Sequence, residues 1–161
     1  MSGPVDINLM VNGERVSAAV EPRKTLVDFL REDLSLTGSH VGCEHGVCGA
    51  CTVRLGGVIV RGCLTLAVQC DGAVVETIEG LSDSGEIADL QDAFERRNAL
   101  QCGYCTPAML LTAADLLRSD DVPSRETIRE HISGNYCRCT GYHAIIDAIE
   151  AVAQARAGVL S

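Results

Sequence analysis

The sequence predicts an α+β protein in two parts, with strands in residues 1–78 and helices in residues 79–161. Apolar residues alternate along Val5–Val11, which is the period of a strand, whereas beyond Gly85 they recur with the period of a helix. The third observation is the cysteines, because eight of the nine fall into two sets of four, one set in each part. Each part is therefore expected to fold around one cysteine set.

The first part is expected to form a small sheet. Asn12-Gly13 separates two alternating segments, and this dipeptide is the strongest short hairpin signal. Thr25 is a candidate N-cap for a short helix, and a glycine-rich loop at 38–50 precedes a second hairpin around Gly56-Gly57. The expected strands are 5–11, 14–20, 51–55, 58–60 and 73–78. Two hairpins, one helix and a closing strand fit a mixed sheet of the β-grasp type.

The second part is expected to be helical. A polar segment at 82–85 links the two parts, and Asp83 and Glu86 have the spacing of a capping pair. Thr106-Pro107 places a cap and a first-turn proline before the next apolar run. Apolar stripes mark helices around 87–94, 108–117, 124–132 and 145–158. These segments predict a C-terminal four-helix bundle.

The clustered cysteines indicate iron. The first set, Cys43, Cys48, Cys51 and Cys63, has the spacing C-x4-C-x2-C-x11-C, and the second, Cys102, Cys105, Cys137 and Cys139, has C-x2-C-x31-C-x-C. The C-x4-C-x2-C run is the loop spacing of a plant-type [2Fe–2S] site. Two four-thiolate sets therefore predict two one-electron carriers close together. Both pairs of the second set precede an apolar helix, so we expect them at helix N-termini, where N–H dipoles favour negative charge.

Charge and hydropathy exclude other classes. The 161 residues carry a formal net charge of −9, whereas binding to nucleic acid depends on Lys and Arg that neutralise phosphates. The sequence has no run of about 18 apolar residues, so no membrane span is expected. Residues 1–11 show no export signal, and a cytoplasmic location is therefore expected. Because the cytosol keeps thiols reduced, this location favours metal binding over a disulfide framework.

Zinc and thiol-exchange chemistry are the alternatives for the cysteines. Structural zinc sites also use four thiolates, but they usually pair two short C-x2-C segments, unlike the glycine-rich first set. The spacing of the second set, taken alone, also suits zinc. Cys102 and Cys105 match a thioredoxin-like C-x-x-C, although that motif expects a preceding strand where a helix is predicted here.

Three further residues are assigned no cofactor role. His45 and His143 would be the kind of ligand that a Rieske site uses, but both four-cysteine sets are already complete. We therefore expect both histidines in loops or at the surface. Cys70 lies outside both sets and is expected to be a small buried hydrophobic residue.

Three motifs resemble a known family. The segments 42–52 (GCEHGVCGACT), 101–107 (QCGYCTP) and 135–142 (NYCRCTGY) are similar to the small iron–sulfur subunit of molybdenum hydroxylases. This is the xanthine dehydrogenase family, which includes carbon monoxide dehydrogenase and bacterial hydroxylases of N-heterocycles. The resemblance covers essentially the whole chain, and it includes all eight clustered cysteines in order.

The resemblance implies two [2Fe–2S] clusters, in a plant-ferredoxin-like domain and a four-helix domain. It also implies a large partner subunit with a molybdenum–molybdopterin cofactor, commonly the cytosine dinucleotide form, and a medium subunit with FAD. Such complexes are commonly dimers of the heterotrimer. Electrons would pass from molybdenum to the second set, then to the first set, then to FAD. By motif, Gln101 would hydrogen-bond the pterin, and Cys139 would be the cluster ligand closest to it.

Two rival functions remain open from the sequence. The chain would alternatively be a free two-cluster ferredoxin, with a charged exposed surface around each cluster, or a zinc-stapled structural module. A pterin-contacting Gln101 argues against a free carrier, because such a carrier meets no pterin. The sequence indicates neither the substrate of the complex nor its final electron acceptor.

Overall fold

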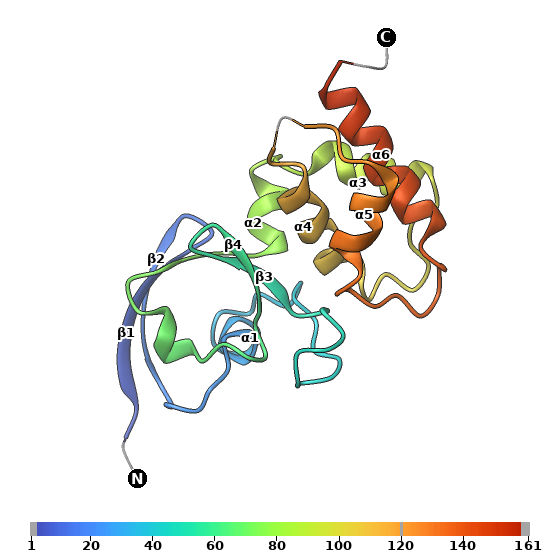
Figure 1. Cartoon of the computed structure of the whole chain (residues 1–161). Helices are drawn as coiled ribbons and strands as arrows, with labels where there is room; N and C mark the ends of the chain where they lie inside the picture. The colour runs from blue at the N-terminus through green and yellow to red at the C-terminus, as the bar shows by residue number, and fades with distance from the viewer. Residues whose placement is uncertain (1–2, 120, 159–161) are drawn as a thin grey trace.

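The computed structural model describes residues 3–119 and 121–158. Within them, a five-stranded mixed sheet and its loops occupy one side of the molecule, and helices α2–α6 gather on the other (Figure 1). The strands are β1 (Val5–Val11), β2 (Glu14–Val20), β3 (Thr52–Leu55), β4 (Val58–Arg61) and β5 (Val74–Glu76). The strand order is β2-β1-β5-β3-β4. The α+β class predicted from the sequence is confirmed.

The first hairpin forms as its sequence predicts. β1 and β2 pair antiparallel from Val5↔Val20 to Val11↔Glu14, with the bounds expected from the alternation. Asn12 and Gly13 adopt φ angles of 50° and 83°, which suits a two-residue turn that follows the twist of the strands. Ile7, Leu9 and Val11 are buried on one face of β1. β1 then pairs in parallel with β5, the central strand, which joins the two hairpins into one sheet over a hydrophobic core.

A short helical segment covers this core. Thr25 caps α1 (Leu26–Asp28), since its hydroxyl accepts a hydrogen bond from Asp28 N at 3.2 Å. The chain continues as a π-helical turn, η1 (Phe29–Asp33), which buries Phe29 and Leu30. Cys70, in the 3₁₀ turn η2 (Ala67–Cys70), is fully buried in the same core, and burial raises the pKa of its thiol. Its environment is that of a small hydrophobic side chain, as expected.

The link between the two parts differs from the sequence prediction. The last strand ends at Glu76 rather than at residue 78, and α2 (Ile78–Asp83) follows almost directly and includes the first two residues of the expected polar linker at 82–85. Ile78 and Leu81, which precede the polar residues, are buried in the helical core, and this burial stabilises a helix that local composition did not predict. The Asp83–Glu86 capping pair was also wrong. Asp83 is the last residue of α2, and α3 begins only at Ala88, with the apolar Ile87 in the N-cap position and Glu86 paired with Arg54.

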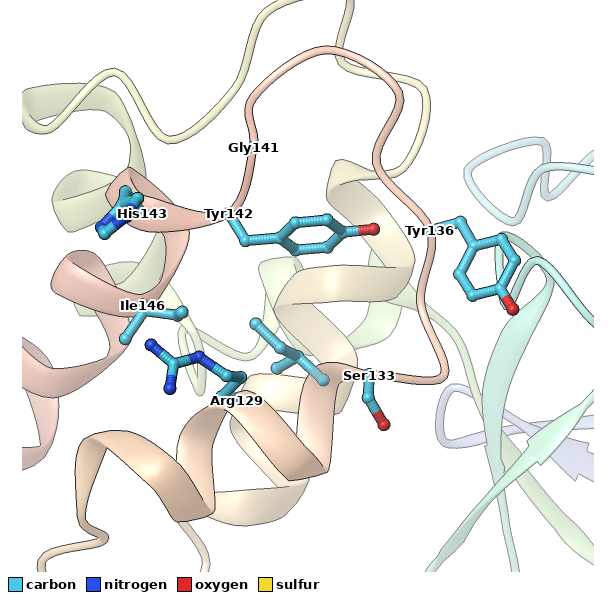
Figure 2. A pocket seen from close by; sticks show the side chains of 8 residues that line it. Arg129, Ser133, Tyr136, Gly141, Tyr142, His143 and Ile146 are labelled. Atoms are coloured by element: carbon cyan, nitrogen blue, oxygen red, sulfur yellow. The ribbon is translucent and has the colours of Figure 1, made fainter.

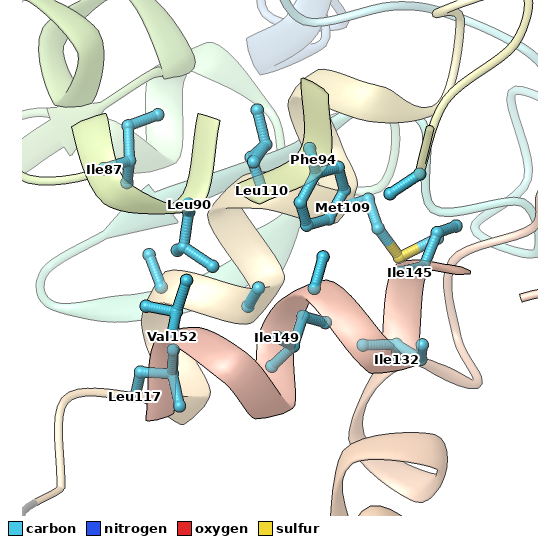
Figure 3. Close-up of a cluster of buried hydrophobic side chains, with 14 of the residues drawn as sticks. Ile87, Leu90, Phe94, Met109, Leu110, Leu117, Ile132, Ile145, Ile149 and Val152 are labelled. Atoms are coloured by element: carbon cyan, nitrogen blue, oxygen red, sulfur yellow. The ribbon is translucent and has the colours of Figure 1, made fainter. Parts of the chain in front are cut away.

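The helical side has a core of its own (Figure 3). Its longer helices are α3 (Ala88–Arg96), α4 (Thr106–Leu116), α5 (Arg125–Ile132) and α6 (His143–Arg156). Phe94, Met109, Ile132 and Ile149 meet there as fully or almost fully buried side chains. No helix in the part of the chain that the structure describes is both long and apolar enough to span a membrane.

Helix α4 connects the two parts. All seven residues from Ala108 to Ala114 are buried, because α4 contacts α2, α3 and α5 and also lies against β3 and β4 of the sheet. An ion pair joins the parts nearby. Arg54 on β3 is only 4% exposed, and its guanidinium contacts Glu76 at 3.3 Å and Glu86 at 2.8 Å.

Replacing Glu86 by Gln should lower stability by about 1 kcal/mol, the upper value for a partly exposed ion pair. The hydrogen bond from Arg54 lowers the pKa of Glu86, so the carboxylate contributes stability above its unfolded pKa, about 4.3, and loses it only as the pH falls through the lower folded value. The difference in unfolding midpoint between wild type and Glu86→Gln should therefore be equal at pH 6 and pH 8. A difference that disappears at pH 6 would contradict this assignment.

Candidate metal-cluster sites

The first cysteine set surrounds a loop that bends sharply between η1 and β3. Glu44, Gly46 and Gly49 all have positive φ angles, of 59°, 83° and 75°. The loop holds Cys43 and Cys48, whereas Cys51 lies directly before β3 and Cys63 lies two residues after β4. The folded loop and the β3–β4 hairpin thus bring the four thiols of this set together.

Backbone amides stabilise negative charge on the first set. Cys48 N donates a hydrogen bond to Cys43 Sγ at 3.3 Å. This bond, with weaker contributions from the His45 and Val47 amides, lowers the pKa of Cys43 to about 6. Burial, together with the neighbouring thiols of Cys63 and Cys48, raises the pKa of Cys51 to about 11.

The second set is assembled from two loops of the helical part. Cys102 and Cys105 precede α4, and Cys137 and Cys139 lie between α5 and α6. Burial and, to a smaller extent, the nearby thiols of Cys137 and Cys102 together raise the pKa of Cys105 to about 12. The pKa of Cys139 is also raised, mainly by its contact with Cys102. The structure therefore brings all four thiols together here as well.

The expected placement at helix N-termini is right for one pair and wrong for the other. Cys105 occupies the N-cap position of α4. Helix α6 begins only at His143, because Gly141 and Tyr142 have positive φ angles of 67° and 71° that interrupt the helical path. Cys137 and Cys139 thus lie before the first turn of α6, and the dipole effect is confined to that turn.

Hydrogen bonds from Thr140 replace the dipole at Cys137. The Thr140 hydroxyl and backbone N–H donate to Cys137 Sγ at 3.0 and 3.4 Å. Burial acts to raise the pKa of Cys137, but hydrogen bonds, chiefly from the Thr140 side chain, outweigh it and the pKa is lowered. The one sequence signal for this role is that a threonine directly follows each cysteine pair of the second set.

The donor chemistry of both sets fits a [2Fe–2S] cluster. Four soft sulfur donors meet in each set, and N–H and O–H groups point at some of the sulfurs. In each set, the thiols affect one another's pKa most strongly in pairs. These pairs are Cys43 with Cys48, Cys51 with Cys63, Cys105 with Cys137, and Cys102 with Cys139. Two thiolates on each of two irons is the arrangement in such clusters. Among the described residues, no three or more His, Cys, Asp or Glu side chains group around a single-ion position.

Gln101 and Cys139 lie together at an exposed rim of the second set. Gln101 Nε2 donates to the Cys139 carbonyl oxygen at 3.1 Å. Both residues are exposed, as is Cys102. His45 and His143 are also exposed, as expected for loop or surface residues. A polar side chain of Gln101 at this edge is available to a partner molecule.

A pocket of about 360 Å³ adjoins the loop of the second set (Figure 2). Tyr142 contributes to its wall and also accepts a hydrogen bond from Cys137 N through its hydroxyl oxygen at 2.8 Å. Arg129, Ser133 and Tyr136 line other sides of it. The sequence patterns did not identify Tyr142 as a support of the cysteine loop.

Tandem cluster-binding folds define an iron–sulfur protein, and comparison with known proteins supports this class. Residues 9–102 match a 2Fe-2S iron-sulfur cluster binding domain, and residues 77–150 match a second [2Fe-2S] binding domain. The chain belongs to the family of small [2Fe–2S] iron–sulfur subunits of molybdenum hydroxylases, and is a non-catalytic subunit of an oxidoreductase.

Relatives with full-length similarity support the family. The chain is 52% identical to the nicotine 6-hydroxylase small subunit of Paenarthrobacter nicotinovorans, over 92% of this chain and 89% of that protein. It is also 52% identical to caffeine dehydrogenase subunit gamma of Pseudomonas sp. (strain CBB1), over 91% of this chain and 89% of that protein. A chain of quinoline 2-oxidoreductase from Pseudomonas putida 86 superposes with a TM-score of 0.90 at 52% identity, covering 96% of this chain and 97% of that one.

Replacing Thr140 by Val should lower the reduction potential of the second site. Reduction adds negative charge to the sulfurs, so removing the hydroxyl donor to Cys137 destabilises the reduced state. A loss of about 1 kcal/mol corresponds to about 40 mV for one electron. A redox titration followed by electron paramagnetic resonance (EPR) measures this shift. Thr140→Ser keeps the hydroxyl and is the control, and a Val variant with the wild-type potential would show that the bond has no such role.

Proposed function

We propose that this chain carries electrons from a molybdenum–pterin centre through two [2Fe–2S] clusters to FAD, with the pterin and the flavin in partner subunits. Each cluster, when bound, supplies a one-electron carrier. We assign Cys43, Cys48, Cys51 and Cys63 as ligands of the first cluster, and Cys102, Cys105, Cys137 and Cys139 as ligands of the second. The convergence of these thiols in two separate sets supports the assignment.

The domain division proposed for this function has a β-grasp, plant-ferredoxin-like domain at 1–78 and a four-helix-bundle domain at 79–161. Two separate hydrophobic cores support it, one on the sheet side and one on the helical side. Contacts among α3, α4, α5 and α6 support the bundle. The short α2 is an addition to that bundle, and it lies at the proposed boundary.

Exposed apolar side chains next to the cysteines in the sequence favour a partner-bound subunit over a free ferredoxin. Among the described residues, nine large hydrophobic side chains are exposed, and five of these lie within two residues of a clustered cysteine. These five are Val47, Leu64, Leu100, Tyr104 and Tyr136, which are 38–63% exposed. A free carrier needs a charged surface there, whereas exposed apolar side chains are typical of a surface that a partner protein covers.

The partners that we propose are a large molybdenum-binding subunit and a medium FAD-binding subunit, assembled as a dimer of heterotrimers in the cytoplasm. Gln101 and Cys139 are proposed to face the pterin, because they occupy the exposed rim of the second set. The relatives named as small subunits support a multi-subunit assembly.

Metal analysis of the natively isolated material tests this proposal. About four irons per molybdenum, with negligible zinc, is the expected result for two [2Fe–2S] clusters beside each molybdenum centre. The same iron content without molybdenum, in a protein that elutes near 17.0 kDa in gel filtration, would indicate a free ferredoxin. Zinc in place of iron would contradict both electron-transfer functions.

Replacing Cys139 by Ser should leave the first cluster in place but impair electron transfer from pterin to flavin. The exposed Cys139 lies on the side of the second set proposed to meet the pterin, whereas the first set is formed by other loops. Flavin reduction in the assembled complex and iron content measure the effect. Cys70→Ser makes the same chemical change outside both sets, so it should retain full iron. Wild-type flavin reduction in Cys139→Ser would contradict the assignment.

A further inference from the structure

The buried amide of Asn135 lies where the loops of the two cysteine sets meet. Asn135 is 2% exposed and precedes Cys137 by two residues. Its Nδ2 donates to Gly49 O at 3.2 Å and to Thr52 Oγ1 at 3.4 Å, on the loop of the first set and the start of β3. Its Oδ1 accepts from Thr112 Oγ1 of α4 at 3.1 Å. One side chain thus joins three separate elements.

The neighbouring polar groups complete this network. Thr52 Oγ1 donates to Gly49 O and accepts from Arg61 Nη1, both at 2.6 Å. Arg61 Nη2 donates to Gly134 O at 2.7 Å, on the loop of the second set. A buried network whose members find partners holds its parts rigidly, because opening it leaves polar groups unpaired in a low-dielectric interior.

The two backbones are also in direct contact at this point. Gly49 has a φ angle of 75°, and a Cβ atom there would lie 2.4 Å from Gly134 O. Such a distance is far inside van der Waals contact, so only glycine permits this approach. A side chain at position 49 would therefore push the two loops apart.

The network around Asn135 lies beside one direct backbone hydrogen bond between the two cysteine loops. Tyr136 N donates to Cys48 O at 2.8 Å. Cys48 belongs to the first set, and Tyr136 directly precedes Cys137 of the second set. The path from one sulfur to the other thus follows covalent bonds except at this single hydrogen bond.

A second contact between the loops is less direct. The Tyr104 hydroxyl donates to Val41 O at 2.7 Å, and its ring stacks on His40 with centroids 4.5 Å apart. This route passes through a whole phenol side chain, and Val41 lies two residues before Cys43. The Cys48–Tyr136 contact is therefore the shorter connection.

We propose that Asn135 is a positioning residue for electron transfer between the two clusters. Its side chain holds the peptide of Cys48 against that of Tyr136 and thereby sets the rate at which one electron passes from the second site to the first. The second site is oxidised and the first is reduced by that electron, and no bond is broken and no proton moves. The inference rests on the proposed function, because it requires both sites to hold clusters.

The test uses the assembled holo-complex with Asn135→Leu, a neutral change of similar size, and Thr112→Val, which removes one hydrogen bond. Thr112→Ser keeps the hydroxyl, and Glu86→Gln weakens a different contact between the two parts of the chain. Iron content and both reduction potentials are measured first. A short pulse of photochemical reductant then supplies electrons, and freeze-quenched EPR spectra follow their redistribution between the clusters. The magnetic coupling between the two signals is measured after full reduction with dithionite.

With iron content and potentials unchanged, the transfer rate should fall on the order of 10-fold in Asn135→Leu, as for the loss of other groups that orient a metal site. The magnetic coupling should weaken, Thr112→Val should show a smaller loss, and both controls should match wild type. A wild-type rate in iron-replete Asn135→Leu would overturn the proposal. If that variant loses iron, Thr112→Val decides, since a wild-type rate there would also overturn it. A wild-type complex without electron exchange between clusters would instead refute the proposed function.

Discussion

The packing of α4 against both the helices and the sheet is the contact on which the rest of this structure depends. Its middle residues are buried all around, as is typical of a helix that lies in the interior between two parts of a protein. The N-terminal end of α4 carries Cys105, and Thr112, further along the helix, bonds to Asn135. The position of the second cysteine set relative to the first therefore follows from how one helix lies on β3. A change in that packing would move both cysteine sets relative to each other.

The two sets stabilise negative sulfur in different ways. In the first set, a loop with positive φ angles at Glu44, Gly46 and Gly49 turns backbone amides toward Cys43. In the second set, the side chain of Thr140 provides the main hydrogen bond to Cys137. Since hydrogen bonds to sulfur help to set the potential of a cluster, the two sites are tuned by separate parts of the chain. A side-chain substitution can therefore remove the main hydrogen bond to sulfur in the second set, whereas the backbone amides of the first set remain after such a change.

Local sequence signals predicted the elements that depend on local chemistry. The Asn12-Gly13 turn and the alternation of β1 fixed the first hairpin with its correct bounds, and the cysteine spacing identified the residues that meet in space. The errors lie where distant contacts decide. Helix α2 forms where a strand end and the start of a linker were expected, because Ile78 and Leu81 reach the helical core. Glu86 lies before the N-cap of α3, and its carboxylate pairs with Arg54, on a strand far away in the sequence. Asn135 was singled out only as part of a motif, since its partners come from three elements that no spacing rule connects.

The exposure of the cysteines gives the second set a direction. Cys102 and Cys139 contact each other and are exposed, beside the exposed Gln101, whose amide donates to the Cys139 carbonyl oxygen. Cys105 and Cys137 form the other pair and are less exposed, and Cys137 follows the residue that bonds to Cys48 of the first set. One pair of sulfurs thus faces a surface that a partner can reach, and the other faces the next cysteine loop. An iron held by each pair would lie near the Gln101 rim in one case and near the first cysteine loop in the other. This arrangement fits the proposed path, in which electrons enter at the Gln101 rim and leave through the Cys48–Tyr136 contact.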